Sequence, residues 1–201
     1  MTSVRLARTD ARERARLDEI CLLTGAAGGD ASAQLDDPRL LTDVYLAPYL
    51  ELEPSLCLVL VDGSDVPVGY AIGTADTATF ERRCATEWWP RVHRQHAGGA
   101  PAPRAALEAH LVERLRDAAP TDPLVLERFP AHLHIDLLPV AQGSGNGRRL
   151  ITAMLDALRE AGAHGVHLGI DPANGRALGF YHHLGFTQVA GADGVVLGKP
   201  L

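Results

Sequence analysis

The stretch that decides the fold runs from residue 131 to residue 161 and reads AHLHIDLLPVAQGSGNGRRLITAMLDALREA. Its first part, Ala131–Leu138, has strand character and stops at Pro139. After a glycine-rich loop, apolar residues recur at spacings of three and four up to Gly162, where a helix C-cap is expected. The stretch therefore predicts a strand, a tight loop and an amphipathic helix in succession.

The loop of this stretch has the composition of an anion site. Gly143, Gly145 and Gly147 let successive backbone N–H groups turn inward, and the helix that begins beside them adds its positive dipole end. Arg148 and Arg149 stand in the first helical turn, where a cation is unfavourable unless an anion is bound nearby. We expect a diphosphate cradle here. The alternative interpretation is a tight glycine turn that carries two solvated arginines.

The rest of the chain alternates between strand and helix patterns, which predicts an α/β or α+β fold. Strands are expected near residues 3–6, 56–61, 68–74, 166–170, 186–189 and 195–197, and helices near 10–25, 38–50, 77–95, 104–118 and 174–184.

Residues 75–130 interrupt this alternation with two helical stretches on either side of the loose sequence 97–103. We expect this helical insertion to form one wall of a substrate groove, and a contact within a homodimer is a second role left open for it. Trp88 and Trp89 fit two interpretations, an anchor of the insertion on the body or an aromatic platform for a substrate.

Composition excludes several classes of protein. The 201 residues suit one domain, 1–201, and a net charge of −6 without a basic run argues against a nucleic-acid partner. No apolar run is long enough to cross a membrane, and the first residues lack the apolar core of a signal peptide. Cys21, Cys57 and Cys84 have neither metal nor redox spacing, which favours the reducing cytoplasm.

Two motifs in order resemble the GNAT superfamily of N-acyltransferases. Gln-x-x-Gly-x-Gly, from Gln142 to Gly147, resembles its acyl-CoA pyrophosphate loop. The stretches HLHIDLLP from His132, AQG from Ala141 and VVLGK from Val195 are similar, within the superfamily, to the acetyltransferase-like C-terminal domain of protein O-GlcNAcase, as in a stand-alone bacterial-type relative. The second motif, Asn-x-x-Ala-x-x-Phe-Tyr-x-x-x-Gly-Phe, is matched by Asn174, Ala177, Phe180, Tyr181, Gly185 and Phe186.

The resemblance implies a mixed, mostly antiparallel twisted sheet with helices on both faces and the helical insertion between strands 3 and 4. It also implies an acetyl-CoA site in the gap where the strand ending near Leu138 splays from the strand at 166–170. The residues expected to bind acetyl-CoA are Leu137, Leu138, Gln142, Gly143, Ser144, Gly145, Asn146, Gly147, Arg148, Arg149, Asn174, Ala177, Phe180 and Tyr181.

Acetyl transfer needs a base, a polarised carbonyl and an acid for the leaving thiolate. Tyr181 matches the superfamily's general acid, and backbone N–H groups around Leu137 and Leu138 would polarise the carbonyl. His132, His134 and Asp136 share one face of their strand by the two-residue period, so Asp136 is the first candidate for the base and His134 the second. Alternatively, these three are structural. A zinc site on the two histidines would need further ligands that the sequence does not assign.

The sequence thus predicts an acetyl-CoA-dependent N-acetyltransferase for an unspecified amine acceptor, histone-acetyltransferase-like by resemblance alone. The alternative is a non-catalytic acetyl-CoA-binding or interaction domain that retains the loop without a competent base.

Overall fold

The computed structural model describes residues 1–8, 10–96, 105–116, 119–172, 174–189 and 195–201. They form a seven-stranded sheet of order β1-β2-β3-β4-β5-β7-β6, in which β4 and β5 are the parallel pair and the other described pairings are antiparallel. The mixed, mostly antiparallel sheet predicted from the sequence is confirmed. The strands are β1 (Ser3–Leu6), β2 (Cys57–Val61), β3 (Pro67–Thr74), β4 (Ala131–Leu137), β5 (Gly165–Ile170), β6 (Thr187–Gln188) and β7 (Val195–Pro200).

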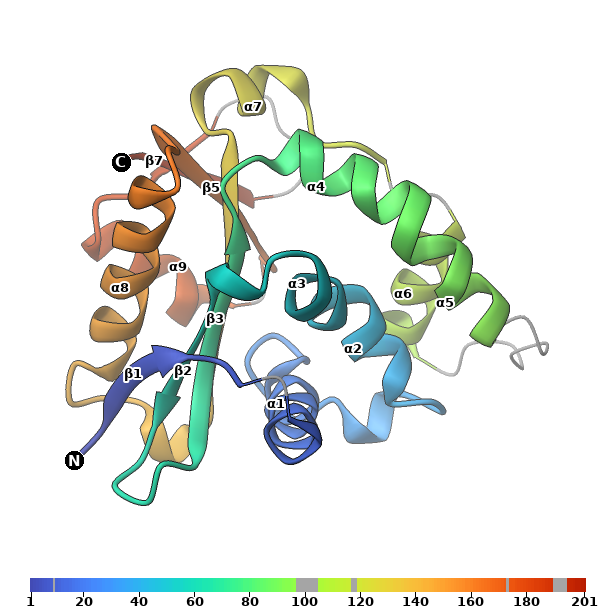
Figure 1. Cartoon of the computed structure of the whole chain (residues 1–201), viewed down its shortest axis with the longest axis horizontal. Coiled ribbons are helices and arrows are strands. Elements are labelled where there is room, and N and C mark those ends of the chain that lie inside the picture. Colours follow the sequence, from blue (N-terminus) through green and yellow to red (C-terminus); the bar gives the residue numbers. More distant parts are fainter. Residues whose placement is uncertain (9, 97–104, 117–118, 173, 190–194) are drawn as a thin grey trace.

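Helices cover both faces of the sheet (Figure 1): α8 and α9 lie on one face, and α1, α2 and α3 on the other. None of the helices in the described part of the chain is long and apolar enough to cross a membrane. The helices are α1 (Ala11–Thr24), α2 (Arg39–Tyr45), α3 (Ala47–Leu52), α4 (Thr77–Arg83), α5 (Trp89–His96), α6 (Ala106–Arg116), α7 (Pro123–Arg128), α8 (Asn146–Glu160) and α9 (Gly175–His183). The short helical turns are Ser32–Gln34, Pro54–Leu56, Cys84–Trp88 and Pro139–Ala141.

The helix expected over 38–50 is divided into α2 and α3. Leu46 leaves helical geometry at φ −124°, and Pro48 then occupies the first turn of α3, where its missing N–H costs no hydrogen bond.

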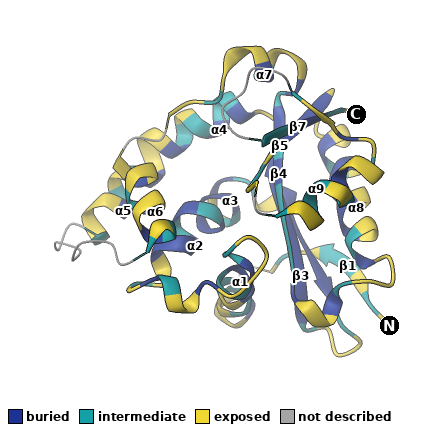
Figure 2. Cartoon of the chain, turned by 180° about the vertical axis from the view of Figure 1, so that it is seen from behind, coloured by how far each residue is buried: buried dark blue, intermediate teal, exposed yellow. Residues whose placement is uncertain are grey.

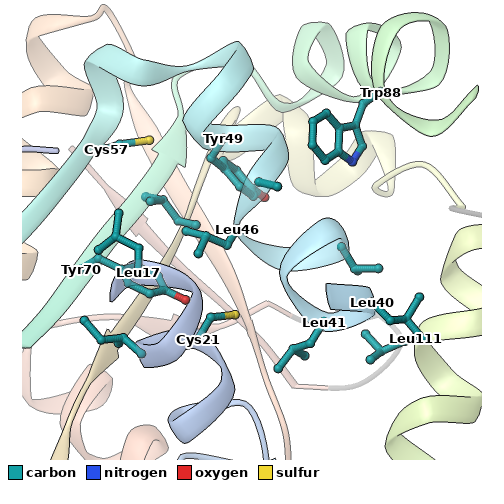
Figure 3. Packing of buried hydrophobic residues seen from close by; sticks show 14 of the residues in the cluster. Leu17, Cys21, Leu40, Leu41, Leu46, Tyr49, Cys57, Tyr70, Trp88 and Leu111 are labelled. Atoms are coloured by element: carbon teal, nitrogen blue, oxygen red, sulfur yellow. The ribbon is translucent and has the colours of Figure 1, made fainter. Parts of the chain in front are cut away.

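Two hydrophobic clusters fill the two sides of the sheet, and alternate residues of a strand supply them. Cys57, Val59 and Val61 face the helices α1–α3, whereas Leu58 and Leu60 face α8. β2 and β3 are accordingly buried along their whole length (Figure 2). Figure 3 shows the first cluster, in which α1, α2 and α3 pack on β2 and β3.

The insertion between β3 and β4 packs on this first cluster through α4, α5 and α6. Phe80, Trp88 and Leu111 are buried there, and Trp88 Nε1 donates to the Asp43 carbonyl at 2.9 Å. The anchoring interpretation fits Trp88. The expected linker at residues 97–103 lies outside the described residues.

The contact between β7 and the start of β4 generates a stability prediction. A Cβ on Gly198 would lie 2.5 Å from the Phe129 ring, so Gly198→Ala should lower the free energy of unfolding by about 1–3 kcal/mol in a urea titration. As a control, Gly179→Ala in α9 meets nothing within 4 Å and should stabilise by roughly 0.5–1 kcal/mol. Equal stability of Gly198→Ala and the unmodified chain would contradict this packing.

Candidate active site

A gap opens between β4 and β5 because the two strands pair over a short distance. Their register joins Ala131 to Val166 and His132 to His167, and β4 then continues to Leu137 without a partner on that side. The cavity of about 150 Å³ in this gap lies beside α9. Its walls are residues 133–136 of β4, residues 168–171 at and beyond the end of β5, and Asn174, Ala177 and Tyr181.

The glycine-rich loop lies at the open end of the gap and has an unusual backbone. Gly143, Ser144 and Gly145 have positive φ angles of 81°, 48° and 75°, respectively, and α8 starts directly afterwards. The N–H groups of Gly147 and Arg148 have no acceptor among the described residues. Free N–H groups at a helix N-terminus are able to bind an anion, so this backbone geometry supports the anion site, which stays a prediction.

Side chains from distant segments hold this loop. Asn146 is 8% exposed, donates to the Ala141 carbonyl at 3.0 Å and accepts from the Thr2 hydroxyl at 2.8 Å. Arg149 donates to the backbone oxygen of Thr2 at 2.9 Å and so ties the residue before β1 to α8, whereas the Arg148 side chain has no hydrogen bond to the described residues. Of the two arginines expected at the anion site, Arg148 is therefore the less engaged. Thr2 was not anticipated.

Gln142 and Arg176 connect the two sides of the gap. Gln142 donates to the Leu137 carbonyl at 2.9 Å and accepts from an Arg176 nitrogen at 2.6 Å. Arg176 lies in the first turn of α9 and was missed by sequence reasoning, because its helix follows a different strand. It places a second cation beside the loop.

The backbone of β4 presents different groups to its two sides. Leu138 donates its N–H to the Val68 carbonyl at 3.0 Å and so cannot polarise a thioester, contrary to the expectation for this residue. Backbone groups of successive residues in a strand point to opposite sides, so the N–H of Leu137 points into the gap.

Asp136 lies on the wall of the gap, on the face covered by α1. Burial raises the pKa of Asp136 above its usual value, and the neighbouring hydroxyls of Tyr70 and Thr24 act in the opposite direction. The Thr24 hydroxyl itself donates to the Ile20 carbonyl at 2.7 Å. Tyr70 stands directly opposite Asp136 in the β3–β4 register, and neither hydroxyl had been identified from the sequence.

His132 and His134 share this face, as the two-residue period predicted. The Tyr49 hydroxyl lies 2.6 Å from His132 Nε2 and 3.0 Å from His134 Nε2, and the Thr77 hydroxyl lies 2.7 Å from His132 Nδ1. Burial is the main cause that lowers the pKa of both imidazoles, to about 4 for His134. In the described part of the chain, no group of three His, Cys, Asp or Glu side chains is arranged to hold a metal ion.

Tyr181 lies on the wall of the gap formed by α9 and is 7% exposed. Burial, and then the charge of Asp136, raises the pKa of its phenol, so it is protonated at neutral pH. Its ring packs edge-on against Phe180 and Phe186.

The other residues of the second motif support this helix. Asn174 caps α9 by accepting from the Ala177 N–H at 3.0 Å. Phe180 lies against Gly147, where a Cβ would come within 3.3 Å of its ring, so α9 contacts the start of α8. The structure thus gathers both motifs around one gap.

Comparisons with known proteins agree with this arrangement. The acetyltransferase (GNAT) family matches residues 120–186. Protein O-GlcNAcase of Rattus norvegicus is 25% identical over 174 residues, which are 82% of this chain and 18% of that protein. The chain therefore spans about a fifth of the length of this relative.

Solved structures extend the likeness to the whole chain. The crystal structure of SsHAT is 39% identical with a TM-score of 0.84, and the match covers 99% of this chain and 98% of that one. The phosphinothricin acetyltransferase of Sinorhizobium meliloti, solved in complex with acetyl-CoA, is 14% identical with a TM-score of 0.56 and coverages of 100% and 88%, a likeness in fold. The chain belongs to the acetyltransferase (GNAT) family.

Proposed function

We propose that the protein transfers an acetyl group from acetyl-CoA to an amine. The observation that carries this proposal is the gap itself, with free N–H groups of a glycine loop at its open end and Asp136 and Tyr181 on its walls. Membership of an acetyltransferase family supports the same chemistry, as does the fold of a relative that binds acetyl-CoA.

The cofactor would lie along the unpaired edge of β4. Its diphosphate would accept hydrogen bonds from the N–H groups of Gly147 and Arg148 and from the exposed Arg148 and Arg176 side chains. The acetyl carbonyl would accept from the Leu137 N–H.

The chemistry then uses the two walls of the gap. The acceptor amine attacks the thioester carbon while the Asp136 carboxylate takes the amine proton, and the C–S bond breaks as Tyr181 donates its phenolic proton to the thiolate. A raised pKa makes Asp136 a stronger base than an ordinary carboxylate. An acid and a base beside the same gap favour an enzyme over a non-catalytic binding domain.

The acceptor enters, in this proposal, from the face covered by α1–α3 and the insertion. The Arg114 guanidinium of α6 lies 5.8 Å from the centre of the Tyr45 ring, whose edge contacts His134 at 6.0 Å between centroids. These contacts support the expectation that the insertion forms one wall of the acceptor site. A histone tail is one acceptor to include among the amines tested.

The loop assignment predicts a charge-specific loss of cofactor affinity. Gly145→Asp adds a negative charge beside the N–H groups, whereas Gly145→Asn adds a side chain of the same shape, and both residues tolerate the positive φ of this position. Repulsion of about 1–4 kcal/mol should weaken acetyl-CoA binding roughly fivefold or more for Asp relative to Asn in titration calorimetry. Equal affinities of the two variants would remove the loop from the binding site.

The assignment of the general acid predicts a change in turnover without a change in affinity. Tyr181→Phe keeps the ring packed against Phe186 and removes the phenolic proton. Acetyl transfer, followed as CoA thiol release with a panel of amines, should slow by about 10²–10⁴-fold while acetyl-CoA affinity stays within twofold of the unmodified value, on the order of the uncertainty of calorimetry. Unchanged turnover would exclude this role.

The base is tested by an isosteric substitution. Asp136→Asn should lower kcat by about 10²–10⁴-fold, because the amide cannot accept the amine proton. Raising the pH should recover part of the rate, since a larger fraction of the amine is then already deprotonated. If Asp136→Asn has an unchanged kcat at neutral pH and gains nothing at higher pH, another group accepts the proton.

A further inference from the structure

Four polar groups form a continuous hydrogen-bonded line from the insertion to the gap. Thr77 lies at the start of α4 and is 1% exposed, and its hydroxyl meets His132 Nδ1. His132 Nε2 meets the Tyr49 hydroxyl, which also meets His134 Nε2. Each hydroxyl and each neutral imidazole carries one proton to donate, so the direction of one bond fixes the direction of all.

The direction is set at Thr77. The His132 ring is the partner of the Thr77 hydroxyl among the described residues, and no carbonyl or carboxylate oxygen of these residues lies within reach to take its proton. A buried hydroxyl that leaves its proton unbonded is unfavourable, so Thr77 donates to His132 Nδ1. His132 therefore holds its proton on Nε2 and donates to the Tyr49 oxygen.

Because the Tyr49 oxygen accepts from His132, the Tyr49 hydroxyl proton is available for His134, its other partner. Tyr49 donates to His134 Nε2, and the proton of a neutral His134 must be on Nδ1. Both imidazoles are neutral at pH 7, because burial, and in both rings the charge of Arg114 as well, lowers their pKa. A second proton on His134 would remove the acceptor that Tyr49 requires.

The Nδ1 atom of His134 has no partner among the described residues. Among these residues, every buried side-chain nitrogen or oxygen has a hydrogen-bond partner, so an Nδ1 without a partner is accessible to solvent. His134 also lines the gap, on the same face as Asp136. We infer that His134 is a fixed hydrogen-bond donor to an oxygen of the acceptor substrate, and that Tyr49 and Thr77 are positioning residues that set its tautomer.

This role differs from the proton acceptor that the sequence suggested as a second choice for His134. The donor role of His134 rests on the proposed function, because its partner is the acceptor of that reaction. It adds one requirement for the acceptor. The acceptor carries an oxygen beside its reacting amine. The nearby guanidinium of Arg114 favours a carboxylate oxygen over a neutral carbonyl.

The test that needs no substrate is the tautomer of His134 in the unmodified protein. Long-range ¹H–¹⁵N spectra of the imidazoles, assigned by His→Asn variants, should show the proton of His134 on Nδ1 and that of His132 on Nε2 between pH 6 and 8. Tyr49→Phe and Thr77→Val should each shift His134 toward the Nε2 tautomer. The matched control is Tyr45→Phe. The Tyr45 ring contacts the His134 ring, but its hydroxyl is bonded to His110, so this variant should leave the His134 tautomer unchanged.

A kinetic comparison tests the role in recognition. Asn at position 134 places an N–H near the Nδ1 position, whereas Leu offers none, so kcat/KM for an amino acid should fall roughly tenfold or more in His134→Leu and recover in His134→Asn. For the matching amine without a carboxylate, kcat/KM should be equal in the two variants.

The outcomes separate the two proposals. An Nε2 proton on His134, or a tautomer that ignores Thr77 and Tyr49, overturns the inference whatever the activity. An Nδ1 proton with equal kcat/KM in both variants overturns the role in recognition. An Nδ1 proton in a protein that binds no acetyl-CoA would leave the donor intact and contradict the proposed function.

Discussion

The site depends on the point at which β4 and β5 stop pairing. Parallel hydrogen bonding ends after His132 and His167, so the next backbone groups of β4 on that side have no strand partner. Unpaired backbone groups inside a protein must find another partner, and the Leu137 carbonyl takes the Gln142 side chain. The N–H groups that remain free along this edge are what a thioester cofactor can use.

The two faces of the sheet give the gap two different walls. On the α8 side, the wall is apolar, with Leu133 of β4 and the ring of Tyr181 from α9. On the α1 side, Asp136 and His134 meet hydroxyls from α1, β3 and α3. In the proposed reaction, this division would separate the place where the thiolate leaves from the place where the amine enters. The insertion reaches the side chains of this face, because the Thr77 hydroxyl contacts His132 and the Arg114 guanidinium lies over the Tyr45 ring.

Local patterns predicted much of this arrangement. The alternation in β4 placed His132, His134 and Asp136 on one face, and the glycine spacing located the loop whose N–H groups, in the described part of the chain, stay free at the start of α8. Tyr49, Tyr70, Thr24 and Arg176 could not be found in this way, because each comes from an element whose contact with the gap depends on the packing of the whole chain. The error at Leu138 has a similar cause: the direction of its N–H follows from the register with β3, which its own sequence does not encode.

Amide hydrogen exchange with and without acetyl-CoA tests the use of this strand edge most directly. The amide of Leu138 is bonded to β3 and should be protected in both states. The amides of Leu137 and Gly147 should exchange quickly in the protein without ligand, and their exchange should slow strongly when acetyl-CoA is added. Unchanged exchange at both of these amides, under conditions where calorimetry records binding, would contradict the account.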